Sequence, residues 1–292
     1  MALITTCVFL FFIFLVSILP FKLIYLFSNF ASFIMANVVK YRSQVVYGNL
    51  EKSFPEKSKT ELKNIANKFY LNLTDNLLES FKSFTMKKSS IIKRHKITNP
   101  ELLESLLTKH KGVIGVTAHY ANWEWGSQSG SLQCKNKFTA LYKPLKNKYI
   151  NQILKKSRTK CGTELISIYK TSAMFEQFKD QGYVFLLAAD QSPAGGKQLD
   201  NAYWFDFFGR KTAFLNGPEK HAKNNNYPVV YIDIQRIKRG HYEIELSLLS
   251  DKPNNLNDGE LTHLYKNKLE EVIRRKPEDW LWSHKRWKRS PA

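Results

Sequence analysis

The sequence contains few cysteines and lacks the short motifs that mark several common enzyme classes. Its three cysteines, Cys7, Cys134 and Cys161, are widely spaced and odd in number, which excludes a disulfide framework and a zinc site of the usual spacing. We expect each of them to be a small buried residue. Phosphate-loop, dinucleotide-binding, HExxH and GxSxG motifs are also absent, which excludes the common nucleotide-binding, zinc-protease and serine-hydrolase functions. We therefore expect no cofactor and no metal ion.

Acidic residues are scarce relative to basic ones. The 292 residues include 45 Lys and Arg against 25 Asp and Glu, a net charge of +20, and 43% of the residues are hydrophobic. This composition predicts a folded chain, and the basic excess favours binding to polyanions such as nucleic acid, anionic lipid headgroups or phosphorylated substrates.

The first 21 residues contain no charged side chain, and Leu3 to Leu19 is almost wholly apolar. This run approaches the roughly 20 residues that a helix needs to cross a bilayer, and a nucleic-acid-binding protein has no use for it. A cleaved secretory signal is the alternative, but signals carry positive charges before the apolar run, whereas Lys22, Lys40 and Arg42 follow it here. We predict an uncleaved anchor in the inner (cytoplasmic) membrane, with the bulk of the chain on the cytoplasmic face.

Residues 23–39 remain apolar and aromatic, which suits a second helix lying in the headgroup layer. We therefore predict an anchor over residues 1–40 and a single catalytic domain over residues 41–292. Within that domain, Ser58 and Glu61 have capping-box spacing at the start of an amphipathic helix that extends to about Phe84. A second helix is predicted from Asn99-Pro100 to near His110.

Beyond residue 112 the pattern changes to short apolar runs separated by helical stretches. Buried strands are predicted at 112–118, 138–142, 165–168, 183–189 and 228–234. Helices are predicted at 148–160, 171–181 and 216–223, the last with Asn216 and Glu219 repeating the capping spacing. Residues 242–249 alternate and predict an antiparallel edge strand, followed by a helix over 259–275. This order predicts an α/β fold with a mostly parallel central sheet flanked by helices.

The motif with the clearest chemical meaning is HYANWE, from His119 to Glu124, directly after the strand predicted at 112–118. The carboxyl end of a buried strand opens into the crevice where such sheets bind ligands. A turn between the two residues would let the Glu124 carboxylate fold back on the imidazole, and a histidine held by a carboxylate can act as a general base. A structural histidine beside a surface glutamate is the alternative.

In this motif the sequence resembles the lipid A late (secondary) acyltransferases, a branch of the glycerolipid and lysophospholipid acyltransferase superfamily. The resemblance extends over nearly the whole chain. It rests on H-x4-E together with VVYGNLEKSFPEKS (45–58), YKPLKNKYINQILKKSRTKCG (142–162), LLAADQSP (186–193), FFGRKTAF (207–214) and WLWSHKRWKRSP (280–291). One departure is Tyr47, which stands where the family pattern has an arginine, so a headgroup contact at that position is not expected.

The resemblance implies transfer of a fatty acyl chain from a thioester, on acyl carrier protein or coenzyme A, to a hydroxyl of a phosphorylated glucosamine lipid precursor. His119 would be the base and Glu124 its orienting partner. Arg158 would contact substrate phosphate or the developing oxyanion, and Asp190 and Gln191 would line the site. Asn122, Trp123 and Lys143 lie in the matching segments and are further predicted substrate-binding residues.

Several of these assignments agree with the residues themselves. Asp190 follows its predicted strand as His119 follows its own, so both would emerge at the same edge of a parallel sheet. Between Lys135 and Lys160 there are nine basic residues and no acid, an arrangement suited to a diphosphorylated head or an acidic carrier protein, although a solvated helical face is the alternative for most of the lysines. Among them the planar guanidinium of Arg158 suits bidentate phosphate binding.

Other features leave alternatives open. The terminal Trp280, Trp282 and Trp287 would contact either the membrane surface or the core. No Ser or Cys stands beside His119 in a nucleophile motif, so direct transfer without an acyl-enzyme is predicted. The acceptor could instead be an amino-lipid, a lysophospholipid or a phosphoinositide mannoside. A non-enzymatic protein that binds anionic membranes or nucleic acid is a more distant alternative.

Overall fold

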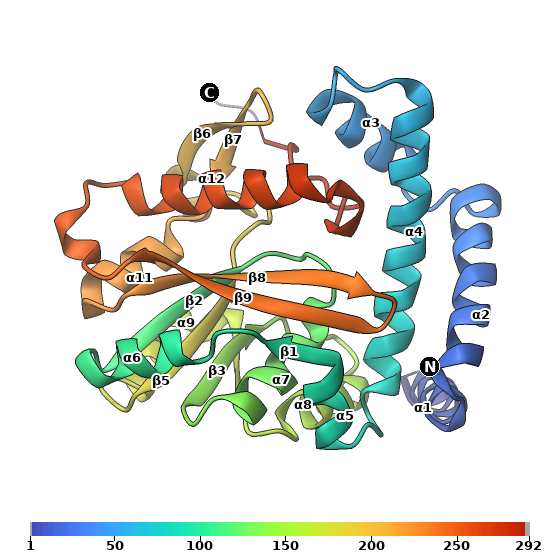
Figure 1. Cartoon of the computed structure of the whole chain (residues 1–292), viewed down its shortest axis with the longest axis horizontal. Helices are drawn as coiled ribbons and strands as arrows, with labels where there is room; N and C mark the ends of the chain where they lie inside the picture. The colour runs from blue at the N-terminus through green and yellow to red at the C-terminus, as the bar shows by residue number, and fades with distance from the viewer. Residues whose placement is uncertain (1, 290–292) are drawn as a thin grey trace.

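The structure, a computed structural model, describes residues 2–289, and within this range a seven-stranded sheet forms the centre of the molecule (Figure 1). The strand order is β1-β9-β8-β2-β5-β3-β4. The strands are His95–Ile97 (β1), Gly112–Thr117 (β2), Lys137–Tyr142 (β3), Glu164–Ser167 (β4), Tyr183–Ala188 (β5), Val229–Lys238 (β8) and His241–Ser250 (β9). Pairing is parallel throughout except between β8 and β9. The predicted α/β fold with a mostly parallel sheet flanked by helices is confirmed.

Helices cover both faces of the sheet. The α-helices after residue 40 are Ser43–Ser53 (α3), Lys59–Lys82 (α4), Lys88–Arg94 (α5), Glu101–Lys109 (α6), Gly126–Gln133 (α7), Lys148–Thr159 (α8), Thr171–Gln177 (α9), Lys197–Asp200 (α10), Gly217–Asn225 (α11) and Glu260–Arg275 (α12). Helix α12 lies along β8 and β9 on one face, and α7 contacts β1 and β3 on the other (Figure 1). The long helix α4 runs past the end of the β8–β9 hairpin and separates the sheet from the N-terminal helices.

The elements read from the sequence match this architecture closely. All five apolar runs are strands, and the helices predicted at 148–160 and 259–275 are α8 and α12. The helix predicted at 171–181 is α9, which ends earlier, at Gln177. The capping box is present at the start of α4, where the Ser58 side chain accepts from the Glu61 backbone and Glu61 accepts from the Ser58 backbone. These two contacts satisfy backbone donors that the first turn of a helix leaves free.

Some details of the prediction are wrong or missing. β9 is not an edge strand, because the three-residue β1 pairs with its outer side. Asn216 makes no side-chain cap at α11, since the Glu219 carboxylate binds the backbone of Gly259 and Thr262 instead. Cys7 is exposed, although Cys134 and Cys161 are buried as expected. The antiparallel hairpin of β6 (Tyr203–Phe207) and β7 (Arg210–Phe214) was not predicted.

The N-terminal residues form two apolar helices, α1 (Ala2–Ile18) and α2 (Phe21–Phe33), and α2 continues into a π-helical turn at Ile34–Val38. Within the described residues, Phe21–Val38 is the helical stretch long and apolar enough, by length and composition alone, to cross a membrane; α1 is slightly shorter. Helix α2 lies beside α4 (Figure 1) and buries Ile24, Ser28 and Ser32. Its other faces expose leucines and phenylalanines.

Candidate active site

His119 and Asp190 meet at the carboxyl edge of the sheet because of the register between two neighbouring strands. β2 pairs in parallel with β5, and its last residue, Thr117, lies opposite Ala188. The residues two positions further on are His119 and Asp190, so they also lie opposite one another. The Nδ1 of His119 is 2.7 Å from Oδ1 of Asp190, and the His119 backbone N–H donates to Oδ2 at 3.0 Å. The prediction that these residues share one edge is confirmed.

Asp190 is held by more than the histidine. Its side chain is only 3% exposed, whereas that of His119 is 23% exposed. The indole Nε1 of Trp280 donates a third hydrogen bond to Oδ2 at 3.0 Å. The buried guanidinium of Arg286 lies close enough for its pKa to be raised by the Asp190 charge, although burial has the larger effect and lowers that pKa to about 10. Three donors and a nearby cation therefore keep a buried carboxylate ionised.

The surroundings of His119 raise its pKa. Burial has the largest effect and lowers the pKa, but the charge of Asp190, its hydrogen bond to the ring and the charge of Glu124 together outweigh burial. The net pKa of Asp190 is lowered. Burial has the largest single effect and raises this pKa, but the charge of His119, its hydrogen bonds and the hydrogen bond from Trp280 together outweigh burial. The pair is therefore arranged as an ionised carboxylate beside an imidazole that readily accepts a proton.

Two other predicted site residues contact the imidazole ring. An ionised Asp190 accepts a hydrogen bond from Nδ1–H, which keeps the proton on Nδ1 and leaves Nε2 as the basic nitrogen. The amide Nε2 of Gln191 lies 3.3 Å from it, and the Trp123 ring packs edge-on against the imidazole with centroids 5.4 Å apart. Gln191 and Trp123, both predicted site residues, thus contact His119 itself.

Glu124 does not take the orienting position predicted for it. Its Oε2 accepts from Nε and Nη2 of Arg158 on α8, at 3.1 and 2.6 Å, while Asp190 occupies Nδ1 of His119. The backbone explains the difference, because Ala121 adopts a left-handed conformation (φ 47°) before the turn at Trp123–Trp125. The chain therefore reverses between His119 and Glu124, and Glu124 contributes charge to the site without bonding to the imidazole.

An apolar cavity of about 350 Å³ opens beside His119, and we call it the sheet cavity. Its polar part is lined by His119, Trp123, Glu124, Arg158 and the exposed Lys143. Its remaining walls are mainly aliphatic and aromatic side chains of the sheet, including Phe138, Leu165, Leu186, Ile232, Ile244 and Leu246. Gly130 of α7 also lines the sheet cavity, and a Cβ there would approach the Phe138 ring to 3.0 Å. The cavity suits a hydrocarbon chain whose reactive end lies at the imidazole.

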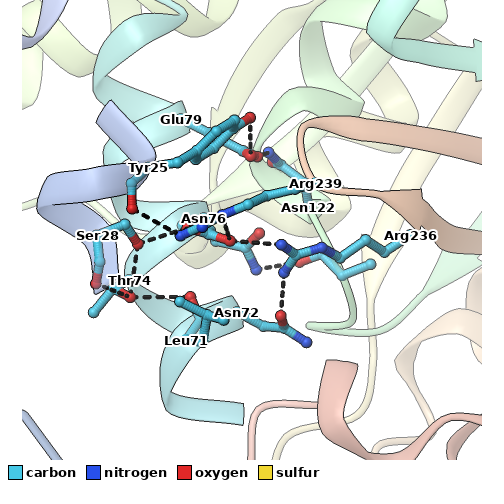
Figure 2. A network of polar contacts seen from close by, with 12 residues as sticks. Tyr25, Ser28, Leu71, Asn72, Thr74, Asn76, Glu79, Asn122, Arg236 and Arg239 are labelled. Carbon is cyan, nitrogen blue, oxygen red and sulfur yellow. Dashed lines mark hydrogen bonds and ion pairs between the residues drawn. The ribbon is translucent and has the colours of Figure 1, made fainter. Parts of the chain in front are cut away.

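Asn122 is fully buried, so it offers no surface to a substrate, and the structure does not support its predicted binding role. Its Nδ2 donates to Glu79 of α4 at 2.7 Å (Figure 2), and its Oδ1 accepts from the Trp125 backbone. Glu79 also accepts from Tyr25 of α2 and Tyr242 of β9. Burial raises the pKa of Glu79 to about 7, against the lowering effect of these hydrogen bonds. Asn122 therefore ties the loop that follows His119 to α4.

A second buried carboxylate on α4 holds α2 and the β8–β9 hairpin together. Asp75 is fully buried and pairs with Arg236 at 2.5 Å and Arg239 at 2.6 Å. The Ser28 hydroxyl of α2 donates to the same carboxylate at 2.6 Å (Figure 2). Removing the Asp75 carboxylate would leave two partly buried guanidinium groups without their counter-charge, a change of the kind that costs about 3–5 kcal/mol. Helix α2 is thus joined to the domain by specific polar contacts as well as by apolar packing.

The C-terminal segment supports the site in a way that the sequence did not reveal. The His119 carbonyl accepts from the backbone of Leu281, and Tyr120 forms an isolated bridge with Trp280. Trp280 and Trp282 are buried, and Trp287 packs partly buried on the same core, so the tryptophans follow the core alternative. The matching segment 280–291 extends past residue 289, so its last two residues lie outside the described range.

Comparison with known proteins gives a consistent result. The profile of the family described as "Bacterial lipid A biosynthesis acyltransferase" matches residues 2–289. The chain is 22% identical over 274 residues to the lipid A biosynthesis lauroyltransferase of Escherichia coli K12, covering 94% of this chain and 88% of that one. It is 23% identical over 255 residues to the lipid A biosynthesis palmitoleoyltransferase of the same strain and to a lipid A biosynthesis acyltransferase of Shigella flexneri, covering in each case 87% of this chain and 81% of the relative. The chain therefore belongs to the bacterial lipid A biosynthesis acyltransferase family and is an acyltransferase.

Proposed function

We propose that this acyltransferase moves a fatty acyl chain from an acyl thioester, carried by acyl carrier protein or coenzyme A, to a hydroxyl of a lipid A precursor, with His119 as the general base. The observation that carries the proposal is the imidazole of His119, which Asp190 holds at the mouth of the apolar sheet cavity. The relatives named for lauroyl and palmitoleoyl transfer support the reaction type.

The reaction follows from this geometry. With Nδ1–H bound to Asp190, Nε2 of His119 takes the proton of the acceptor hydroxyl as its oxygen bonds to the thioester carbonyl carbon. The acceptor hydroxyl displaces the Gln191 amide from Nε2 when it binds. Collapse of the tetrahedral intermediate breaks the C–S bond, and the imidazolium returns the proton to the departing thiolate. Asp190 holds the ring orientation and stabilises the imidazolium in between.

The cationic side chains at the cavity mouth match the charge of both substrates. Arg158 lies on α8 beside Lys155, and Lys143 precedes that helix; all three line the sheet cavity. A guanidinium that already binds Glu124 in forked geometry is preorganised for a phosphate oxygen or for the oxyanion of the intermediate. We infer that Arg158 and Glu124 act together in binding the acceptor, and that Lys143 contacts phosphate or the acidic carrier.

The N-terminal helices provide the membrane attachment in this proposal. α1 and α2 both expose many large apolar side chains, including Leu3, Val8, Phe11, Leu26 and Phe30. Such a surface is stable against lipid and costly in water. We propose that residues 1–40 anchor the enzyme to the inner membrane and that residues 41–292 form the catalytic domain on the cytoplasmic face.

The proposal is tested by reconstituting the purified full-length protein in vesicles and offering acyl carrier protein and coenzyme A thioesters with a panel of acceptors. We expect transfer to a lipid A precursor, and we expect His119→Ala to lose at least about a thousandfold in kcat while its melting temperature stays close to that of the wild type. Transfer to a lysophospholipid or an amino-lipid alone would contradict the proposed acceptor. Full activity of folded His119→Ala would contradict the proposed mechanism.

A further inference from the structure

A second cavity, of about 390 Å³, lies on the other side of α8 from the sheet cavity, and we call it the helix cavity. The two cavities share Trp123, Glu124, Leu145, Leu154 and Arg158. Helix α8 separates them: Asn151 and Lys155 line only the sheet cavity, and Ile150 and Ser157 line only the helix cavity. The Glu124–Arg158 ion pair therefore stands at the junction of two chambers.

One face of α4 and a residue of α1 complete the helix cavity. Leu73, Leu77, Ser80 and Phe81 recur at intervals of three and four along α4, so they project from a single face, and Phe84 continues the lining just beyond the end of the helix. Phe9 of α1 also lines the cavity. Helix α1 is held there by edge-on packing of Phe9 and Phe12 on Phe81.

Further contacts fix α1 at the other end. The Asn147 side chain at the start of α8 donates to the Ala2 carbonyl and to the hydroxyl of Thr6. The apolar helix proposed to lie in the membrane is therefore one wall of the helix cavity. Leu77 and Leu145, which also line this cavity, are 49% and 47% exposed, so the cavity is open to the surface past apolar side chains.

We propose that the helix cavity binds a hydrocarbon chain already carried by the lipid acceptor, while the sheet cavity binds the acyl chain of the donor. This inference rests on the proposed function. Direct transfer requires both lipids to be present at once, so two chains need two separate apolar sites that meet at the Glu124–Arg158 pair, near His119, which lines the sheet cavity.

The position of each chamber decides which substrate it takes. A chain that remains in the bilayer enters beside α1, which lines only the helix cavity, whereas the donor chain is brought from water on a soluble carrier. The helix cavity also contains polar groups, such as Ser80, Ser157 and the buried Gln128. The Oε1 of Gln128 has no hydrogen-bond partner within residues 2–289, so it is free to accept from a hydroxyl or amide group near the head of the acceptor chain.

The test compares Leu77→Trp, which fills the helix cavity, with Leu26→Trp, the same change at an exposed leucine of α2 that lines neither cavity. Two acceptors are used: the lipid A precursor, and the same diphosphorylated glucosamine disaccharide with short, water-soluble chains. Excluding about two methylenes from a binding site raises KM by about tenfold. We expect Leu77→Trp to raise KM for the long-chain acceptor by that factor, without changing kcat/KM for the short-chain acceptor or the preference for donor chain length.

The outcomes separate the two proposals. Wild-type protein that transfers to neither acceptor would overturn the proposed function and the helix-cavity assignment with it. Transfer by the wild type that Leu77→Trp leaves unchanged, or reduces equally for both acceptors, would overturn only the assignment. A shift in donor chain-length preference in Leu77→Trp would show that the helix cavity binds the donor chain instead, which would overturn the assignment.

A second measurement on the unaltered full-length protein does not depend on the folding of any variant. A photoreactive diazirine is placed near the end of the acceptor chain in one experiment and near the end of the donor chain in another. We expect the acceptor probe to label α4 around Leu77 and Phe81, and the donor probe to label the strands that line the sheet cavity. The reverse pattern would overturn the assignment.

Discussion

Replacing Asp190 with asparagine tests which carboxylate orients the catalytic histidine. In the structure Asp190 accepts from Nδ1 of His119, from the His119 backbone and from the Trp280 indole. Asparagine has nearly the same shape but only one accepting oxygen, and it carries no charge. It can therefore no longer satisfy all three donors, and it no longer stabilises an imidazolium.

The expected effect on activity is large because it combines two losses. An amide facing Nδ1 favours the tautomer with the proton on Nε2, so the base is unavailable, and the charged intermediate loses its partner. Comparable changes in hydrolytic triads lower kcat by about 10⁴. Some correctly oriented histidine persists through the remaining backbone contact, so we expect kcat for Asp190→Asn to fall by about 10²–10⁴.

The same substitution should shift the pH dependence. The net raised pKa of His119 depends on the charge and hydrogen bond of Asp190, which oppose the larger lowering effect of burial. The neutral imidazole is the active base, so wild-type kcat/KM should rise with pH through a pKa above the ordinary histidine value. In Asp190→Asn that acidic limb should move to lower pH, because burial then dominates. Glu124→Gln should move it in the same direction but less, because Glu124 acts on the imidazole through charge alone.

The assay is the pH profile of kcat/KM for acyl transfer from a carrier-protein thioester, measured for the wild type, Asp190→Asn and Glu124→Gln. Asp206→Asn, at a 68% exposed position on β6, is the matched control and should behave as the wild type. Thermal unfolding of each protein shows whether it is folded. The reasoning is refuted if folded Asp190→Asn keeps nearly full activity, or if the acidic limb moves only in Glu124→Gln.

Three further predictions concern binding and stability. Arg158→Lys keeps the charge but loses the forked contact with Glu124, so kcat/KM for a diphosphorylated acceptor should fall by about tenfold and much less for a dephosphorylated one; an equal loss with both would exclude phosphate binding. Because burial raises the pKa of Glu79 to about 7, the folded state favours the protonated carboxyl. The stability that this provides is fully present below pH 4 and is lost as pH rises through 7. In urea unfolding, the free energy of unfolding of the wild type should fall by about 3 kcal/mol between pH 4 and pH 8 relative to that of Glu79→Gln. Parallel pH profiles of this free energy for the two proteins would contradict the prediction. Ser58→Ala removes the capping box of α4 and should cost about 1 kcal/mol, seen as a melting temperature lower by about 2 °C; no change would exclude a stabilising cap.

Much of the fold could be predicted because buried parallel strands appear in the sequence as short, continuous apolar runs. The run at 112–118 is strand β2, and the alternation of such runs with helical patterns identified the sheet as mostly parallel. β1 was missed because three residues are too few for a pattern. The β6–β7 hairpin was missed because only its turn, at Phe208 and Gly209, carries a local signal.

Asn122 shows why the role of a single residue can be mispredicted from the motif that contains it. It lies within the HYANWE motif, and its position there predicts contact with substrate. Its side chain instead binds Glu79, on a helix that precedes it by more than 40 residues in the chain. Its burial depends on how α4 packs against the loop, and no local pattern encodes that. Trp280 is similar, because its bond to Asp190 forms only when the C-terminal segment folds back beside β2.

The sequence by itself determined the α/β alternation, the apolar N-terminus, and the edge of the sheet at which His119 and Asp190 emerge, because these depend on local hydrophobicity and on the common direction of parallel strands. The tertiary structure alone decided which carboxylate meets the imidazole. A hydrogen bond requires contact to within about 3 Å, and that contact is set by the register of β2 against β5 and by the reversal of the chain at Ala121. Both arise from the packing of the whole sheet, so spacing along the chain favoured Glu124 whereas the fold selected Asp190.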